Sequence, residues 1–149
     1  MGSIRGIALG SCEWKRKSLE LQKMRPITRK GLKRKCDIMW RTIIYHRDKF
    51  ACQVCGKPGR NAHHIFSKGG YPNMRLSMEN GILLCVYHHR AFAHAKTQAF
   101  QDWLIKKKGA SWYNSLGIQA NLSGLQNRKI DYKLTEIYLR EIMDRENLI

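Results

Sequence analysis

Two closely spaced pairs of cysteine and histidine residues have the spacing of metal ligands. Cys52 and Cys55 form a Cys-x2-Cys pair, and Cys85 and His88 form a Cys-x2-His pair, with 29 residues between the two. A gap of two residues lets both side chains of a pair reach one ion, and two such pairs complete a tetrahedral Cys3His zinc site. Buried free cysteines would explain one pair, but two pairs with this spacing favour metal binding. We therefore expect these four residues to bind a structural zinc ion.

The overall charge points to a polyanionic partner. The chain of 149 residues has 28 Lys and Arg against 11 Asp and Glu, which gives a formal net charge of +17. Such a charge opposes compaction of the chain, and the simplest partner that would explain it is nucleic acid. A ribosome-associated protein, or one that is merely basic and soluble, would show a similar balance, so charge alone does not separate these classes.

The positive charge is concentrated at the start of the chain. Residues 1–35 contain eleven basic and two acidic residues. We expect residues 1–31 to form a flexible or partly helical basic arm that follows DNA phosphates, because Pro26 and Gly31 interrupt any helical pattern there. The proposed DNA contacts are Arg29, Lys30, Lys33, Arg34 and Lys35 in and after this arm, and Lys68 and Arg75 in a later loop.

Four further histidines lie close to the two pairs. His63 and His64 are adjacent, and His89 and His94 follow the second pair. Adjacent residues of a strand point to opposite faces, so His63 and His64 are not expected to bind the same ion. His94 follows His89 by five residues, a poor spacing on a regular helix, where residues four apart share a face. His94 is therefore either a third metal ligand or a contact to solvent or phosphate.

The sequence has no sign of membrane insertion. No stretch approaches the roughly 18 apolar residues that a membrane-spanning helix needs, and the segment "IRGIALG" is too short for a secretory signal. We expect a cytoplasmic protein whose five cysteines are reduced, and in that compartment close cysteines indicate metal binding before disulfides. Cys12 and Cys36 lie outside both pairs and are expected not to bind metal.

The elements around these residues indicate a small α+β fold in which helices are the majority. Apolar spacing predicts a core-facing helix over 36–47, and residues 61–66 read as a short strand. Residues 81–87 are either the second strand of a hairpin or the entry to a helix, and residues 88–95 look helical. A helix follows from Thr97, its expected N-cap, to a stop at Gly109.

The end of the chain shows one further clear element. Residues 111–128 are mixed, with turns expected at Gly117 and Gly124. Residues 131–147 predict an amphipathic helix that presents Leu134, Ile137, Tyr138, Glu141 and Ile142 along one face.

The motif "CQVCG…AHHIF…GG…ENGILLCVYHH" resembles the HNH (ββα-metal) endonuclease family, and in particular its zinc-stapled phage members. The resemblance runs from about Arg47 to His94. It implies a hairpin and a helix around one catalytic metal ion, with a zinc knuckle that ties the two together. The implied organisation is a basic arm over 1–31, an HNH domain over 32–128 and a C-terminal helix over 129–149.

The resemblance also implies roles for individual residues. His63 and His89 match the metal ligands, His64 matches the general base, and Asn80 matches the residue that holds the intervening loop against the hairpin. Two positions depart from the commoner pattern. Most relatives have Asp where this chain has His63, and many have Cys where it has His88, which is an equivalent zinc ligand.

The function implied is a metal-dependent DNA endonuclease that uses a single ion and a histidine base. The catalytic ion is expected to be Mn²⁺, Co²⁺, Ni²⁺ or Mg²⁺, and the setting a phage-infected or prophage-carrying bacterial cytoplasm. Branched or recombination DNA is one expected substrate, and the C-terminal helix is a candidate homodimer contact. The competing interpretation is a non-catalytic zinc module that only binds nucleic acid, although such a module has no use for His63 and His64.

Overall fold

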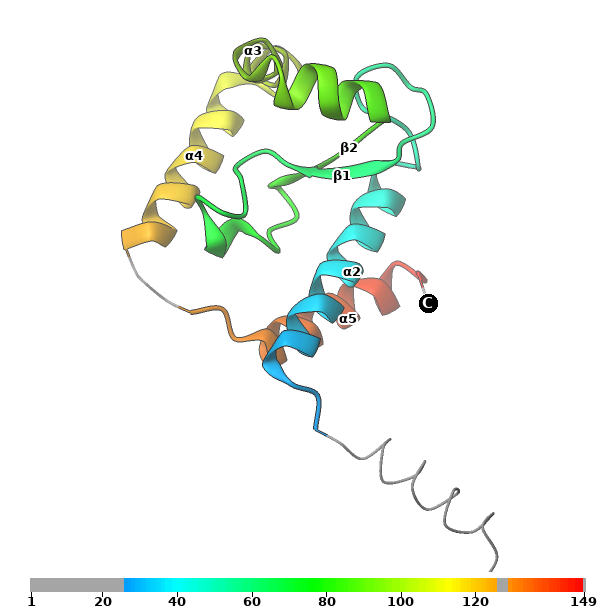
Figure 1. The fold of residues 1–149 in the computed structure, drawn as a ribbon, viewed down its shortest axis with the longest axis vertical. Coiled ribbons are helices and arrows are strands. Elements are labelled where there is room, and N and C mark those ends of the chain that lie inside the picture. The colour runs from blue at the N-terminus through cyan, green and yellow to red at the C-terminus, as the bar shows by residue number, and fades with distance from the viewer. Residues whose placement is uncertain (1–25, 126–128, 149) are drawn as a thin grey trace, which may run out of the picture.

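The structure is a computed structural model that describes residues 26–125 and 129–148. A two-stranded hairpin lies between two pairs of helices, α3 with α4 and α2 with α5 (Figure 1). This arrangement confirms the α+β class. Most of the predicted basic arm, residues 1–25, lies outside the described residues. The elements are α2 (Arg29–Arg47), β1 (Asn61–His64), η1 (Pro72–Met74), β2 (Gly81–Leu84), η2 (His88–His94), α3 (Thr97–Lys108), α4 (Ala110–Leu125) and α5 (Tyr132–Arg145).

Helix α2 begins at Arg29, earlier than the predicted start at residue 36. The Thr28 hydroxyl caps it by accepting a hydrogen bond of 3.1 Å from the Gly31 amide. Pro26 precedes this cap and Gly31 lies in the first turn, so neither interrupts the helix. Arg29 and Lys30, the last basic residues of the predicted flexible or partly helical arm, are therefore helical. The helix buries Cys36, Met39, Trp40, Ile43 and Ile44.

The hairpin confirms residues 81–84 as a strand rather than a helix entry. Strands β1 and β2 are antiparallel, with His63 opposite Ile82 and His64 opposite Gly81. Helix α2 packs tightly on this hairpin, because a Cβ atom on Gly81 would lie 2.5 Å from Ile44 Cδ1 and 2.7 Å from Trp40 Cζ2. The absence of a side chain at Gly81 therefore lets α2 approach His64.

Polar contacts fix the end of α2 to β2. The buried Asp48 carboxylate accepts a hydrogen bond of 2.7 Å from the Leu83 amide. Arg47 pairs with the same carboxylate at 2.8 Å and donates to the carbonyl groups of Met78 and Gly81. The charge of Asp48 is thus compensated where it is buried.

Helices α3 and α4 cover the other side of the hairpin. Gly109, at φ +95°, ends α3 as predicted, but Thr97 is its first residue and Lys96 its cap position. The expectation of mixed structure with turns at Gly117 and Gly124 was wrong, because residues Ala110–Leu125 form one helix. Leu116 and Ala120, four residues apart, are buried beside Met74. This packing outweighs the low helix propensity of glycine.

The C-terminal helix is confirmed, but the face that the sequence predicted is mostly exposed. The Asp131 carboxylate caps α5 by accepting from the Lys133 and Leu134 amides. Leu134, Ile137 and Tyr138 are exposed, while the residues packed toward α2 are Tyr132, Leu139, Ile142 and Met143. None of the helices in the described part of the chain has the length and apolar character that a bilayer crossing requires.

Candidate metal centres and active site

The four predicted zinc ligands form one cluster at the end of the hairpin. Cys52 and Cys55 lie in the turn between α2 and β1, while Cys85 and His88 follow β2. Their ligand atoms lie within 4.8 Å of one another. The Cys55 and Cys85 Sγ atoms are 3.9 Å apart, and His88 Nδ1 lies 3.2 Å from Cys85 Sγ and 3.7 Å from Cys52 Sγ. A tetrahedral zinc with bonds of about 2.3 Å to sulfur separates two sulfur ligands by about 3.8 Å, so this donor set fits the ion.

The surroundings of Cys52 favour the thiolate that zinc needs. Burial alone would raise the pKa of its thiol, but the backbone amides of Cys85, Cys55 and Val54 lower the pKa below the ordinary value. These amides stabilise the negative charge that a metal-bound sulfur carries. Cys36 lies outside the cluster, fully buried in α2, where burial raises the pKa of its thiol.

A second cluster consists of His63, His89 and His94, whose ligand atoms also lie within 4.8 Å of one another. His63 comes from β1 and is 8% exposed, while His89 and His94 come from η2. The Nε2 atoms of His89 and His94 are 3.3 Å apart. The ring of His63 meets both edge-on, at centroid distances of 5.3 and 4.9 Å. Three imidazoles from two elements therefore point at one position.

The shape of η2 explains how His94 reaches this cluster. Residues His88–His94 form a π-helix, in which the Ala95 amide donates to the Arg90 carbonyl five residues earlier. This wider turn brings residues five apart to the same side, which a regular α-helix would not do. Such π-helical turns are frequent at functional sites. The structure thus places His94 beside His89 rather than away from it.

The surroundings of His63 and His89 favour the neutral imidazole that a metal ligand needs. Burial lowers the pKa of His63 to about 3, and the neighbouring His94, His89 and His64 lower it in the same direction. Burial and His94 also lower the pKa of His89. Nitrogen lone pairs are therefore available for an ion, and imidazole donors suit transition metals better than they suit Mg²⁺.

His64 does not belong to this cluster and is fixed on two sides. Its Nε2 atom lies 2.8 Å from the Arg75 carbonyl oxygen. A carbonyl only accepts hydrogen bonds, so Nε2 carries the proton and Nδ1 keeps a free lone pair. The Trp40 indole stacks on the imidazole at a centroid distance of 4.1 Å. Burial lowers the pKa of His64, while its bond to Arg75 opposes that shift. The side chain is therefore neutral and able to accept a proton at pH 7.

Asn80 ties the loop between the strands to β1. Its side chain is fully buried and donates to the carbonyl groups of Phe66 and Met74, each at 2.9 Å. Its Oδ1 atom accepts from the Phe66 amide at 2.7 Å, and its own carbonyl accepts from the Ile65 amide. These four bonds hold the loop that carries the Arg75 carbonyl next to His64.

The predicted DNA contacts divide into charge-compensated and exposed groups. The Arg75 guanidinium is held by Asp37 through two bonds of 2.7 and 2.6 Å, which also raise its pKa. Its charge is thus compensated, and its position relative to His64 indicates a structural role rather than a phosphate contact. Lys35 pairs with Glu136 at 2.8 Å, and Arg29 lies over the Tyr132 ring. The remaining predicted contacts, Lys30, Lys33, Arg34 and Lys68, are exposed.

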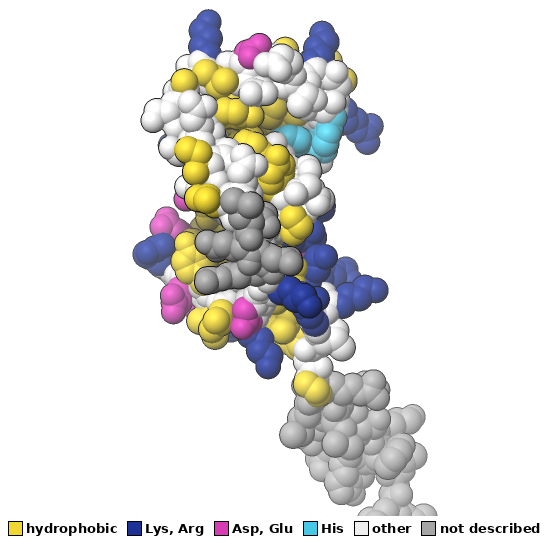
Figure 2. Space-filling model, turned by 90° about the vertical axis from the view of Figure 1, so that its left-hand side faces the viewer, with side chains coloured by type: hydrophobic (Ala, Val, Ile, Leu, Met, Phe, Trp, Pro, Cys, Tyr) yellow, Lys and Arg dark blue, Asp and Glu magenta, His cyan; other side chains and the backbone are white. Residues whose placement is uncertain are grey.

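A cleft of about 540 Å³ between α2 and β1 joins these groups. His64 and His89 both line it, so the cleft reaches His64 and one member of the three-histidine cluster. In Figure 2 histidines emerge at the edge from which most of the visible Lys and Arg side chains project. The cationic side chains that line the cleft are Arg34, Arg41, Arg60 and Lys68, and within the described residues no carboxylate pairs with any of them.

The sequence predicted Arg34 and Lys68 as DNA contacts, but it did not reveal other residues that line the cleft. Trp40 has the spacing of a core residue and is buried. That spacing predicts burial of the ring but not its stack on His64. Arg41 follows the predicted contact Arg34 by seven residues, the spacing of one helical face, but this signal requires a helix that begins before residue 36. Asp37 becomes relevant only through its partner in a distant loop.

Comparison with known proteins gives one match. Residues 52–97 match the family model described as HNH endonuclease. No curated protein and no solved structure matches the chain significantly. The matched segment contains both clusters, together with His64 and Asn80. Residues 52–97, the segment that carries the two metal-ligand clusters, therefore match an HNH endonuclease domain.

Proposed function

We propose that the protein is a metal-dependent DNA endonuclease in which His64 is the general base and His63, His89 and His94 hold the catalytic ion. The observation that carries this proposal is the common cleft, which is lined both by His64, a proton acceptor, and by His89, one member of the three-imidazole cluster. The cations along the same cleft are complementary to a phosphate backbone. The four-ligand cluster supplies a separate structural zinc site.

Each group has its own task in the proposed mechanism. A bound divalent ion would neutralise charge on the scissile phosphate and its leaving oxygen. His64 takes a proton from the attacking water at Nδ1, because the Arg75 carbonyl holds the proton of Nε2 on the opposite side of the ring. Arg34 and Lys68 attract the strand into the cleft. The expected products carry 5′-phosphate and 3′-hydroxyl ends.

The alternative is a zinc module that binds nucleic acid without cutting it. The cysteine cluster and the positive charge fit both functions. The three-histidine cluster separates them, because a purely structural module has no need of a second metal site. Metal analysis of the purified protein distinguishes the two: one tightly held zinc per chain favours the binder, and zinc with a second, exchangeable ion favours the nuclease.

The direct test is the variant His64→Ala, assayed on plasmid, linear duplex and four-way-junction DNA. We expect cleavage to fall by about 10²- to 10⁴-fold, the usual contribution of a general base. Zinc content and DNA affinity should stay unchanged, because His64 belongs to neither cluster. Added imidazole should restore part of the activity by entering the space left by the ring. Cleavage by His64→Ala at a rate comparable to wild type would refute the assignment of the base.

A further inference from the structure

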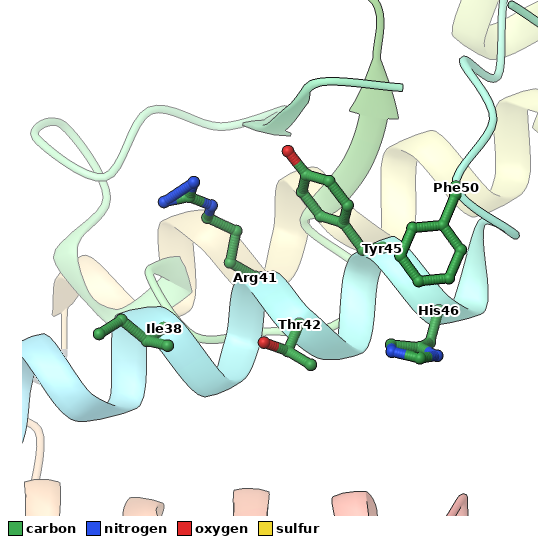
Figure 3. A pocket seen from close by; sticks show the side chains of 6 residues that line it. All are labelled: Ile38, Arg41, Thr42, Tyr45, His46 and Phe50. Atoms are coloured by element: carbon green, nitrogen blue, oxygen red, sulfur yellow. The ribbon is translucent and has the colours of Figure 1, made fainter. Parts of the chain in front are cut away.

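The outer face of α2 carries a second hollow, of about 410 Å³, next to the proposed active site. Five residues of one helical face and one residue beyond the helix end surround it: Ile38, Arg41, Thr42, Tyr45, His46 and Phe50 (Figure 3). We propose that this hollow binds an unpaired nucleobase of the DNA strand that occupies the cleft. The inference deepens the proposed nuclease function and rests on it.

Aromatic rings dominate the hollow. Tyr45 and Phe50 lie side by side in Figure 3, and their rings meet edge-on at a centroid distance of 6.1 Å. His46 contacts Phe50 from another direction at 4.7 Å. The Phe50 side chain is 53% exposed, so a large part of its ring is open to a ligand. Exposed aromatic rings are the groups on which proteins stack single-stranded bases.

The hollow is continuous with the cleft that holds the histidines. Ile38 and Arg41 line both spaces, so Arg41 stands at the boundary between the aromatic rings and the proposed site of cleavage. The Tyr45 hydroxyl donates to the carbonyl of Arg60, whose side chain also lines the cleft. A strand whose phosphate reaches His64 therefore passes Arg41 and Arg60 before it reaches Phe50.

The backbone conformation at Phe50 is unusual for a residue of this size. Lys49 and Phe50 both have positive φ, at +54° and +55°. This region is unfavourable for bulky residues, and a helix end with this geometry usually has glycine. Strain of this kind is concentrated at functional sites. A phenylalanine with a strained backbone and a half-exposed ring contributes little to the stability of the fold, so its ring is available for a ligand.

The chemistry of the hollow selects its occupant. Its rings offer a stacking surface, and the neighbouring Arg41 and Arg60 attract phosphate, so one unit that has both a planar base and a phosphate fits best. A base inside a duplex is already covered on both faces by its neighbours. The occupant is therefore a base in a single-stranded extension or at a branch, and the favoured substrate is DNA with unpaired nucleotides beside the cleavage point.

The test measures binding in the full chain with His64→Ala, which prevents cleavage. Three fluorescent DNA probes are compared by anisotropy: a blunt duplex, the same duplex with a single-stranded extension, and the same extension made of abasic nucleotides. The extension with bases should bind about tenfold more tightly than the abasic one, given the usual contribution of one stacked base. Phe50→Leu should abolish this difference, and Phe50→Tyr should keep it. Ile118→Ala removes a similarly exposed apolar side chain on α4 and should change nothing.

Two further variants separate stacking from other effects. Arg41→Ala should weaken all three probes alike, because it removes a phosphate contact. Phe50→Gly relieves the positive φ, so its melting temperature should not fall below that of Phe50→Leu, while its selectivity for bases is lost equally. Equal affinity of Phe50→Leu and its parent for the extension with bases would overturn the proposal. The proposal would also be overturned if Phe50→Leu changed the oligomeric state of the protein and left its DNA affinity unchanged. A second copy of the chain would then be the occupant of the hollow.

The nuclease proposal fails separately from this inference. If the protein with an intact His64 cuts none of the three probes while base selectivity depends on Phe50, the binding site stands and the proposed activity does not. If the protein cuts DNA but Phe50→Leu leaves base selectivity unchanged, the activity stands and the binding site does not.

Discussion

The indole of Trp40 lies parallel to the imidazole of His64, with ring centroids 4.1 Å apart and an interplanar angle of 10°. Trp40 belongs to α2, outside the residues 52–97 that match the HNH endonuclease model. Its Nε1–H group donates to the Ser77 carbonyl at 2.8 Å, which fixes the indole in turn. The orientation of the proposed general base thus depends on a helix that the matched segment does not contain.

Substitutions at Trp40 should reveal this dependence. Trp40→Phe and Trp40→Leu both lose the bond to Ser77 and a buried indole, so both should melt earlier and by similar amounts. Only phenylalanine keeps a ring to stack on His64. We expect single-turnover cleavage by the leucine variant to be about ten- to a hundredfold slower than by the phenylalanine variant, because small displacements of catalytic groups are costly. Equal rates in the two variants would mean that the stack does not position His64.

The zinc cluster should dominate stability. Structural zinc contributes free energy of folding on the order of 10 kcal/mol in small zinc-folded peptides. Cys52→Ser or Cys85→Ser should therefore lower the melting temperature severely and release zinc. Cys36→Ala is the matched control, because this buried cysteine lies outside the cluster. It should cost only a modest amount of stability and keep the zinc, and unchanged melting of Cys85→Ser would show that the two pairs do not share one ion.

Features that depend on local spacing could be predicted from the sequence. The Cys-x2-Cys and Cys-x2-His pairs converge because each pair needs only its own turn and the hairpin joins them. The adjacent histidines separate, His63 toward the cluster and His64 toward Trp40, because strand residues alternate. Gly109 ends its helix because its positive φ suits glycine.

Features that depend on distant partners could not be predicted. The π-helical turn that brings His94 to His89 has no periodic signal in "HHRAFAH". Gly117 remains helical because α4 packs over η1, a contact between segments far apart in the chain. The Arg75 guanidinium is paired because α2 presents Asp37 to it. In each case tertiary contact decided between conformations that the local sequence left open.

Removal of residues 1–25 should weaken DNA binding without abolishing cleavage of short substrates. This segment has six basic and two acidic residues. The deletion should end before Pro26, because Thr28 caps α2 and its loss would disturb the helix itself. Each lost phosphate contact should reduce the slope of log affinity against log salt by about 0.9. Affinities measured between 50 and 200 mM salt, roughly the range over which such contacts matter, would show an unchanged slope if these residues do not contact phosphate.

The last prediction concerns the catalytic ion. All three proposed ligands, His63, His89 and His94, are imidazoles, and no carboxylate belongs to the cluster that the described residues form. Imidazole suits Mn²⁺, Co²⁺ and Ni²⁺, whereas Mg²⁺ prefers oxygen donors. We therefore expect these three ions to support cleavage at lower concentrations than Mg²⁺. Because His63 is the most buried of the ligands and faces both others, its replacement should change the preference most.

His63→Asp introduces one hard, charged oxygen donor and should shift the preference toward Mg²⁺. His94→Ala is the companion variant, because it removes a donor without adding oxygen, and it should raise the concentration required for every ion. The measurement is the cleavage rate against metal concentration for each ion in the three proteins, with the structural zinc content checked in each. If the original protein works best at low Mg²⁺ and His63→Asp leaves the order of the ions unchanged, His63 does not bind the catalytic ion. The second cluster would then need another role, because the three imidazoles that β1 and the π-helical turn bring together would have no ion to share.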